Sequence, residues 1–138
     1  MLTVTRSFAF DAAHRVLGHQ GKCRHLHGHR YLAEVTVESL ELNALGMVID
    51  FSILKERVGG WIDEHWDHNF LAHPSDPLLE QQHLFEKPPY TMSEDYPNPT
   101  AENLARMLFG LCRTVLPELK VVNVRLYETP NCWTDFHD

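Results

Sequence analysis

Two segments in the first third of the chain alternate between apolar and polar residues, and this pattern commits them to strands. In residues 2–10 one set of alternate positions is mostly apolar, and in residues 31–38 the apolar set is Ala33, Val35 and Val37. Successive side chains of a strand point to opposite faces of a sheet, so each segment is expected to bury one face. The first predicted strand also places His14 just beyond its end.

A cluster of metal-binding residue types lies between these two segments. Residues 23–29 read Cys-Arg-His-Leu-His-Gly-His. In an extended segment His27 and His29 point to the same side, with Gly28 between them. Two imidazoles with a third ligand from elsewhere and an open fourth position are typical of a catalytic zinc site. The alternative interpretation is a polar loop that happens to be rich in histidine.

The middle of the chain predicts a short strand and then a helix. A turn near residues 43–46 leads to the apolar run 47–49, which we interpret as a strand. Asp50 is a candidate N-cap for a helix that continues to about residue 65, because apolar residues recur there with a period of 3.6. Gly59 and Gly60 are unfavourable inside a helix and indicate close packing or a bend. The proline-rich residues 73–99 are interpreted as a long loop.

The C-terminal part predicts a second helix and a final strand. Thr100 is a candidate N-cap, and Pro117 ends the helix that follows it. Residues 121–128 are expected to form a strand whose inward face carries Val122, Val124 and Leu126 and ends in Glu128. A carboxylate on an apolar strand face needs a partner. The alternative is that the strand frays and Glu128 reaches water.

Size and charge limit the possible classes of protein. The 138 residues are expected to form a single domain spanning 1–138. The net charge of −7 and the lack of a basic cluster argue against nucleic-acid binding. No apolar run approaches the roughly 20 residues that cross a bilayer, so we expect no membrane association. Three cysteines without paired spacing favour a reducing, cytoplasmic location.

Six short motifs, in order along nearly the whole chain, resemble the 6-pyruvoyltetrahydropterin synthase / 6-carboxytetrahydropterin synthase family. They are Phe-x-Ala-Ala-His at 10–14, Cys-x-x-x-His-Gly-His at 23–29, Gly-Met-Val-x-Asp-Phe at 46–51, Asp-His at 67–68, Pro-Thr-x-Glu-Asn-Leu at 99–104 and Glu-Thr at 128–129. Trp66 departs from the leucine that usually precedes Asp-His. The resemblance implies an α+β tunnelling fold (T-fold), in which an antiparallel four-stranded sheet carries two helices on one face. Subunits of that fold join into an oligomeric barrel, so the chain is expected to be a homohexamer, a dimer of trimers, with active sites between subunits.

The resemblance implies that His14, His27 and His29 bind Zn²⁺, which agrees with the spacing of the last two. An alternative is a closed structural site in which Cys23 is a fourth zinc ligand, because thiolate is a good ligand for zinc. The two alternatives differ in what Cys23 does, and the sequence leaves both open.

The remaining site residues are also taken from the resemblance. Cys23 is expected to act as a thiolate base, with Asp67 and His68 in proton transfer. From adjacency alone, Asp67 and His68 are equally compatible with an ordinary helix end. Glu128 is expected to accept two N–H groups of a pterin ring, and Thr129 can assist through its hydroxyl.

The implied activity is that of a zinc-dependent lyase acting on 7,8-dihydroneopterin triphosphate. The three residues between Cys23 and His27 resemble the branch of queuosine biosynthesis that forms 6-carboxy-5,6,7,8-tetrahydropterin with release of acetaldehyde and triphosphate. One alternative is 6-pyruvoyltetrahydropterin synthase of biopterin synthesis. Another is a non-enzymatic zinc- or pterin-binding module, which would need the three histidines but not Cys23, Asp67 and His68 together.

Overall fold

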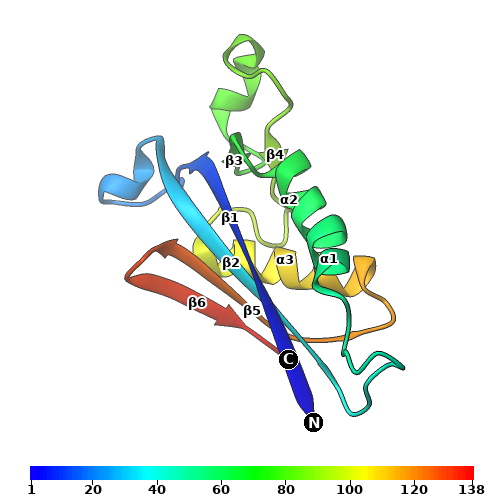
Figure 1. Cartoon of the computed structure of the whole chain (residues 1–138). Helices are drawn as coiled ribbons and strands as arrows, with labels where there is room; N and C mark the ends of the chain where they lie inside the picture. Colours follow the sequence, from blue (N-terminus) through cyan, green and yellow to red (C-terminus); the bar gives the residue numbers. More distant parts are fainter.

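Two long antiparallel strands form the centre of the structure, a computed structural model that describes residues 1–138 (Figure 1). Strand β1 (Leu2–His14) pairs with β2 (His27–Ser39) along its whole length, from Leu2 opposite Ser39 to His14 opposite His27. The apolar positions predicted from alternation, such as Phe10 and Val35, are buried. His14 is the last residue of β1 and not a residue beyond it.

The sheet has six strands, in the order β4-β3-β1-β2-β5-β6. The other four strands are β3 (Asn69–Ala72), β4 (Tyr90–Thr91), β5 (Lys120–Thr129) and β6 (Cys132–Phe136). The expectation of four antiparallel strands is therefore wrong, since β3 is parallel to both β1 and β4. Strand β3 is only four residues long and buried throughout, and β4 has two residues, so neither shows the alternation that reveals a half-buried strand.

Two helical segments pack on the same face of the sheet (Figure 1). The first comprises α1 (Phe51–Leu54), a π-helical turn (Lys55–Gly59) and α2 (Gly60–His65). The second is α3 (Ala101–Val115). Both predicted N-caps are present: Asp50 accepts a hydrogen bond from the Ser52 amide, and Thr100 accepts one from the Asn103 amide. None of the helices is both long enough and apolar enough to cross a lipid bilayer.

The glycine pair in the first helical segment marks the close packing that the sequence suggested. A Cβ atom at Gly59 would lie 3.1 Å from the ring of Phe8 on β1, whereas one at Gly60 would meet nothing within 4 Å. The π-helical turn ends at Gly59. The missing side chain thus lets this helical segment approach β1 closely.

Two further expectations about local structure are wrong. Residues 47–49 form no strand, because the Asn43 carboxamide accepts hydrogen bonds from the amides of Leu45 and Met47 and holds the segment in a turn before α1. Val122 does not lie on the inward face of β5, because an irregularity in the pairing with β2 turns Val121 inward instead. The predicted inward face resumes at Val124, and β5 continues through Glu128 without fraying.

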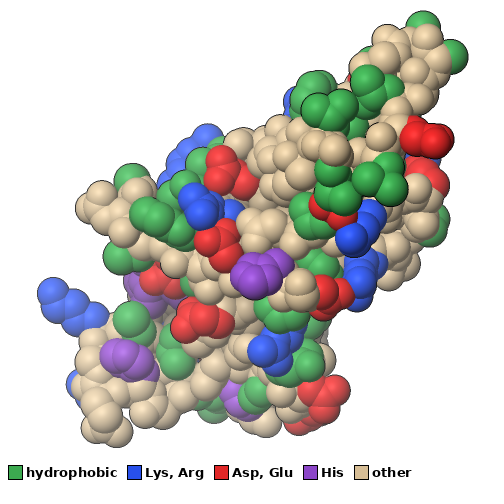
Figure 2. Space-filling view, turned by 90° about the horizontal axis from the view of Figure 1, so that it is seen from below, with side chains coloured by type: hydrophobic (Ala, Val, Ile, Leu, Met, Phe, Trp, Pro, Cys, Tyr) green, Lys and Arg blue, Asp and Glu red, His purple; other side chains and the backbone are tan.

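The long connection between β3 and β4 is only partly irregular. It contains two short 3-10 turns, Pro77–Glu80 and Gln82–Leu84, and projects beyond the end of the sheet (Figure 1). A further 3-10 turn, Lys22–Arg24, lies in the β1–β2 connection and contains Cys23. On the face shown in Figure 2, basic and acidic side chains are interspersed.

Candidate metal centre and the Asp67–His68 pair

Three histidines come together where β1 ends and β2 begins. His14 lies opposite His27 in the β1–β2 register, and His29 follows two residues along β2 on the same face. One nitrogen from each imidazole lies within 4.8 Å of the other two. The residue between the two β2 histidines, Gly28, leaves room for β1, since a Cβ there would lie 3.3 Å from the carbonyl oxygen of Ala12.

Main-chain carbonyls orient two of these imidazoles. His14 Nδ1 lies 2.7 Å from the carbonyl oxygen of Pro99, and His27 Nδ1 lies 2.6 Å from that of His25. A carbonyl only accepts hydrogen bonds, so each Nδ1 must carry the proton and each neutral ring presents a lone pair at Nε2. The two Nε2 atoms face each other at 3.1 Å. Two lone pairs at this distance repel unless a cation lies between them, so the geometry fits a metal ion.

The third imidazole completes the set. His29 Nε2 is buried without a hydrogen-bond partner, and Glu128 Oε1 on β5 lies 3.5 Å from it. Burial lowers the pKa of His14 and of His29 below the ordinary value of 6.5, which keeps both rings neutral near neutral pH. Neutral imidazole is the form that binds metal. These three side chains therefore fit a nitrogen-ligated metal ion such as zinc.

The other predicted residues near the three histidines occupy distinct positions. The Cys23 thiol, on a partly exposed turn, is not part of the compact ligand group, so the structure does not assemble the closed four-ligand alternative. Glu128 faces the imidazoles from β5, as its strand parity predicted. The Thr129 hydroxyl accepts a hydrogen bond from the Asn131 amide in the β5–β6 turn.

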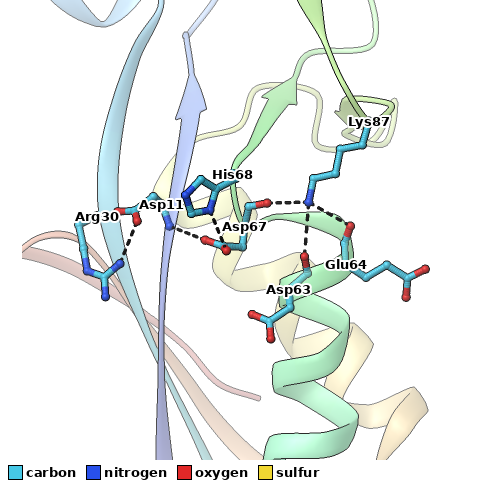
Figure 3. A network of polar contacts seen from close by, with 7 residues as sticks. All are labelled: Asp11, Arg30, Asp63, Glu64, Asp67, His68 and Lys87. Atoms are coloured by element: carbon cyan, nitrogen blue, oxygen red, sulfur yellow. Dashed lines mark hydrogen bonds and ion pairs between the residues drawn. The ribbon is translucent and has the colours of Figure 1, made fainter.

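The Asp67–His68 pair lies on the other side of β1, in a network drawn in Figure 3. Asp67 Oδ2 accepts a hydrogen bond from His68 Nδ1 at 2.8 Å, and Asp67 Oδ1 accepts one from the Asp11 amide at 2.9 Å. The His68 amide donates to the Asp11 carbonyl at 2.6 Å. Because its other nitrogen is free of this network and the side chain is 76% exposed, His68 Nε2 is open to a reactant.

Asp67 is held in its ionised form. Its partial burial raises the carboxyl pKa, but the hydrogen bonds from Asp11 and His68 and the nearby Lys87 ammonium outweigh that effect and leave the pKa below 3.8. Asp11 belongs to the same cluster, but Arg30 donates to its carboxylate at 2.9 Å. Hydrogen bonds and an ion pair within the protein thus satisfy this second group of acidic and histidine side chains.

A cavity of about 580 Å³ lies beside the Asp67–His68 pair, over the face of β1 and β2 that carries Asp11 and Arg30, whereas the three imidazoles point to the opposite face. Its lining includes His29 from the three-histidine group and His68 from the pair, with Leu26, Phe70 and Phe85 supplying apolar surface. The Cys23 side chain is not part of this lining. Within one chain, the cavity therefore belongs to the Asp67–His68 pair, and His14, His27 and Cys23 lie outside its lining.

Several groups that shape the site had no signal in the sequence. The carbonyls of Pro99 and His25 are main-chain groups, which any residue type supplies. Asp11 contributes chiefly through its own amide and carbonyl, and Lys87 comes from a segment without periodicity. The one available hint was Pro-Thr-x-Glu-Asn-Leu, which begins at Pro99.

The fold and the three-histidine centre define an α+β protein with a candidate metal site where the two central strands of a mixed sheet end and begin. The family model described as 6-pyruvoyl tetrahydropterin synthase matches residues 3–138. The chain belongs to this family.

Relatives and solved structures agree with the family. A protein of Rickettsia bellii named 6-carboxy-5,6,7,8-tetrahydropterin synthase is 40% identical, with 98% of this chain and 99% of the relative aligned. A Haemophilus influenzae protein of the same name is 34% identical over the full length of both. An uncharacterized protein from Wolinella succinogenes superposes with a TM-score of 0.80 at 28% identity, covering 99% of this chain and 98% of the other. The Caenorhabditis elegans 6-pyruvoyl tetrahydropterin synthase superposes with a TM-score of 0.72 at 24% identity, covering 99% and 95%, and so shares the fold.

Proposed function

We propose that the chain is a zinc-dependent 6-carboxy-5,6,7,8-tetrahydropterin synthase of queuosine biosynthesis. It would convert 7,8-dihydroneopterin triphosphate to 6-carboxytetrahydropterin, acetaldehyde and triphosphate. The product follows the name of the relatives aligned over the whole chain, and the substrate follows the resemblance of the motifs. The observation that carries the proposal is the pair of Nε2 atoms of His14 and His27, which face each other at 3.1 Å.

In this proposal His14, His27 and His29 hold the zinc ion. When bound, zinc would act as a Lewis acid that polarises a substrate oxygen and makes a neighbouring proton easier to remove. The chain contributes neutral ligands, because burial lowers the pKa of His14 and His29. It also fixes the ring tautomers through the Pro99 and His25 carbonyls.

The proton-transfer groups are Cys23, Asp67 and His68. Cys23 would take a proton from the substrate side chain as a thiolate, from a partly exposed position four residues before His27 on the chain. Asp67 keeps the proton of His68 on Nδ1, so Nε2 is the atom that would accept and return a proton. The cavity lined by His68 offers room for a substrate beside this pair.

Glu128 would orient the substrate. A pterin ring presents adjacent N–H donors, and a carboxylate can accept two of them side by side. Glu128 lies beside His29, so a ring held there would place its side chain close to the three histidines. The Thr129 hydroxyl, which is engaged in the β5–β6 turn, would assist only if that turn adjusts.

The wider context of the proposal is a cytoplasmic carbon–carbon and carbon–oxygen lyase that works as a homohexamer. The cytoplasmic location rests on the three cysteines, which are all free. No interaction with nucleic acid is proposed, in line with the acidic net charge.

The test is incubation of the purified protein with 7,8-dihydroneopterin triphosphate, followed by product identification by mass and an assay for acetaldehyde. We expect acetaldehyde together with 6-carboxytetrahydropterin, because shortening the three-carbon side chain must expel the other two carbons. A 6-pyruvoyl product without acetaldehyde would instead assign the chain to biopterin synthesis. Pterin binding without turnover would support a binding module.

Two variants separate the metal ligands from the base. His27→Ala is expected to lose zinc, as measured by elemental analysis, because it removes one of three ligands. Cys23→Ala is expected to keep its zinc and lose turnover. Loss of zinc from the cysteine variant would show that Cys23 is a ligand, and zinc retention by a folded His27→Ala protein would contradict the metal site.

A further inference from the structure

The connection between β3 and β4 folds back onto the segment that carries the Asp67–His68 pair. The ring of Phe85 stacks on that of Phe70 with centroids 5.5 Å apart. The Asn69 carboxamide donates to the Pro88 carbonyl at 3.1 Å. Two contacts therefore dock residues 85–88 beside His68, although they lie about 20 residues further along the chain.

Lys87 lies between these contacts and points its ammonium at the end of the first helical segment (Figure 3). It donates to the Asp67 carbonyl at 2.6 Å and, at longer range, to the carbonyls of Glu64 at 3.3 Å and Asp63 at 3.4 Å. The last carbonyls of a helix have no partner within the helix and carry partial negative charge. The carbonyls of Asp63 and Glu64 belong to this helix end, and that of Asp67 follows it. A lysine ammonium offers three donors, which suits these three carbonyls.

The main chain at His68 needs this support. His68 is the only residue other than glycine with a positive φ, 54°, in the region that L side chains rarely adopt. Its amide is held by the Asp11 carbonyl on one side, while the Asp67 carbonyl is held by Lys87 on the other. The turn that aims the imidazole is thus fixed from both directions.

We propose that Lys87 is a positioning residue for the Asp67–His68 pair, and that the β3–β4 connection serves to deliver it. Lys87 acts through the Asp67 carbonyl and does not touch the reacting atoms. The role of Asp67 and His68 in proton transfer rests on the proposed function, whereas their geometry does not.

The charges around the pair are consistent with this role. The groups that face Asp67 are His68, the Lys87 ammonium and the main chain of Asp11, whose own carboxylate is paired with Arg30. The ammonium of Lys87 contacts only carbonyl oxygens, so no side-chain carboxylate neutralises it. Lys87 is therefore an unpaired cation close to Asp67. Its charge helps to keep the Asp67 carboxyl ionised.

The test compares Lys87→Met, Lys87→Arg and a control, Lys55→Met. Lys55 is exposed on the first helical segment, and its ammonium makes no hydrogen bond. We expect Lys87→Met to lower kcat by roughly 10- to 100-fold with little change in KM and zinc content, because the pair is misplaced rather than removed. Lys87→Arg, which keeps a cation with several donors, should restore most of the activity, and Lys55→Met should match the parent protein.

A crystal structure of Lys87→Met tests the geometry without an activity assay. We expect the His68 backbone to leave its positive φ or the Asp67–His68 hydrogen bond to be lost, whereas Lys55→Met should retain both. An unchanged pair in Lys87→Met overturns the inference, and so does an unaltered kcat in an active enzyme. If the parent protein shows no turnover, the proposed function fails, while the crystal structures still decide the role of Lys87.

Discussion

Single residues of the site are held in place largely by main-chain groups. Two of the three imidazoles use Nδ1 to contact a carbonyl, and the Asp67–His68 pair contacts both the amide and the carbonyl of Asp11. A main-chain partner survives most substitutions of nearby side chains. Individual site residues should therefore be replaceable without loss of the fold, which makes functional variants interpretable.

Glu128→Gln tests the substrate anchor. The amide keeps the size of the side chain but loses the charge and one acceptor, so a ring with adjacent N–H donors should bind about 10- to 100-fold more weakly. Calorimetry with a pterin measures the affinity, and elemental analysis should show unchanged zinc. Glu56→Gln, on the exposed side of the first helical segment, is the control. Equal affinity of both variants would rule out the anchor role.

Asp76 links the β3–β4 connection to Arg15, the residue that follows β1, through a largely buried ion pair. Its side chain is fully buried, Arg15 Nε donates to it at 2.8 Å, and the Leu78 amide donates at 2.8 Å. Burial raises the carboxyl pKa, but these contacts outweigh burial and depress it below 3.8. Because the carboxyl pKa is lower in the folded protein, the ionised carboxylate stabilises the fold at pH values above 3.8, the pKa in the unfolded chain. This stabilisation is lost as the pH falls through the folded-state pKa.

Asp76→Asn is expected to lower the free energy of unfolding by about 3 kcal/mol at neutral pH, since it leaves the Arg15 charge without a partner. As the pH drops below 3.8, the stability of the variant should also fall less steeply than that of the parent protein. Urea unfolding at a series of pH values measures both effects. Asp63→Asn, at an exposed position, is the control. Parallel pH profiles of Asp76→Asn and the parent protein would contradict this account.

The sequence predicted the directions of the candidate site residues better than their surroundings. Strand parity placed His27 and His29 on one face and Glu128 on the inward face of its strand, because side-chain direction follows from local periodicity. The partners that fix the tautomers are main-chain carbonyls, and a carbonyl has the same chemistry in every residue. The pairing of Asp11 with residues 67 and 68 depends on the parallel contact of β3 with β1, which no local pattern reveals.

Elements of secondary structure were predictable where one face is buried and the segment is long. Strands β1, β2 and β5 and both helical segments meet that condition. Strand β3 is buried on all four residues and β4 has only two, so the parallel part of the sheet was missed. Strand β6 was missed as well, because most of its residues are exposed and its alternation is weak. The inward direction of Val121 in place of Val122 arises from the irregular pairing of β5 with β2, and the sequence of β5 alone does not indicate it.

The two glycines of the first helical segment provide a matched test of its packing. Gly60→Ala should raise the free energy of unfolding by about 0.5–1 kcal/mol, because the site is helical and a Cβ meets nothing. Gly59→Ala should lower it, because the Cβ would press on the buried Phe8 ring at 3.1 Å. Thermal and urea unfolding measure both values. A gain of equal size in the two variants would show that the helix does not pack closely on β1.

For the whole molecule, the sheet has two outer strands, β4 and β6. Strand β6 forms one edge of the sheet over five residues, and its Trp133 is half exposed. Open edges are sites where further strands can pair. The barrel implied by the family resemblance would use such edges to join neighbouring subunits.

The expected assembly is a homohexamer. Size-exclusion chromatography with light scattering should give about six times the chain mass of 16.0 kDa. Dilution over a wide concentration range should leave that mass unchanged if the subunits are held by continuous strand pairing. A mass equal to one chain would contradict the barrel.

The hydrogen bond between His14 and the Pro99 carbonyl has a thermodynamic consequence. Pro99 immediately precedes the N-cap of α3, and Asn103 in the first turn of that helix donates to the carbonyl of Asn98. Anything that locks the His14 ring in its present orientation therefore also stabilises the docking of α3, and linkage makes this coupling reciprocal. Metal binding to the three histidines should slow amide hydrogen exchange at the start of α3. Conversely, substitutions that loosen this end of the helix should weaken metal affinity.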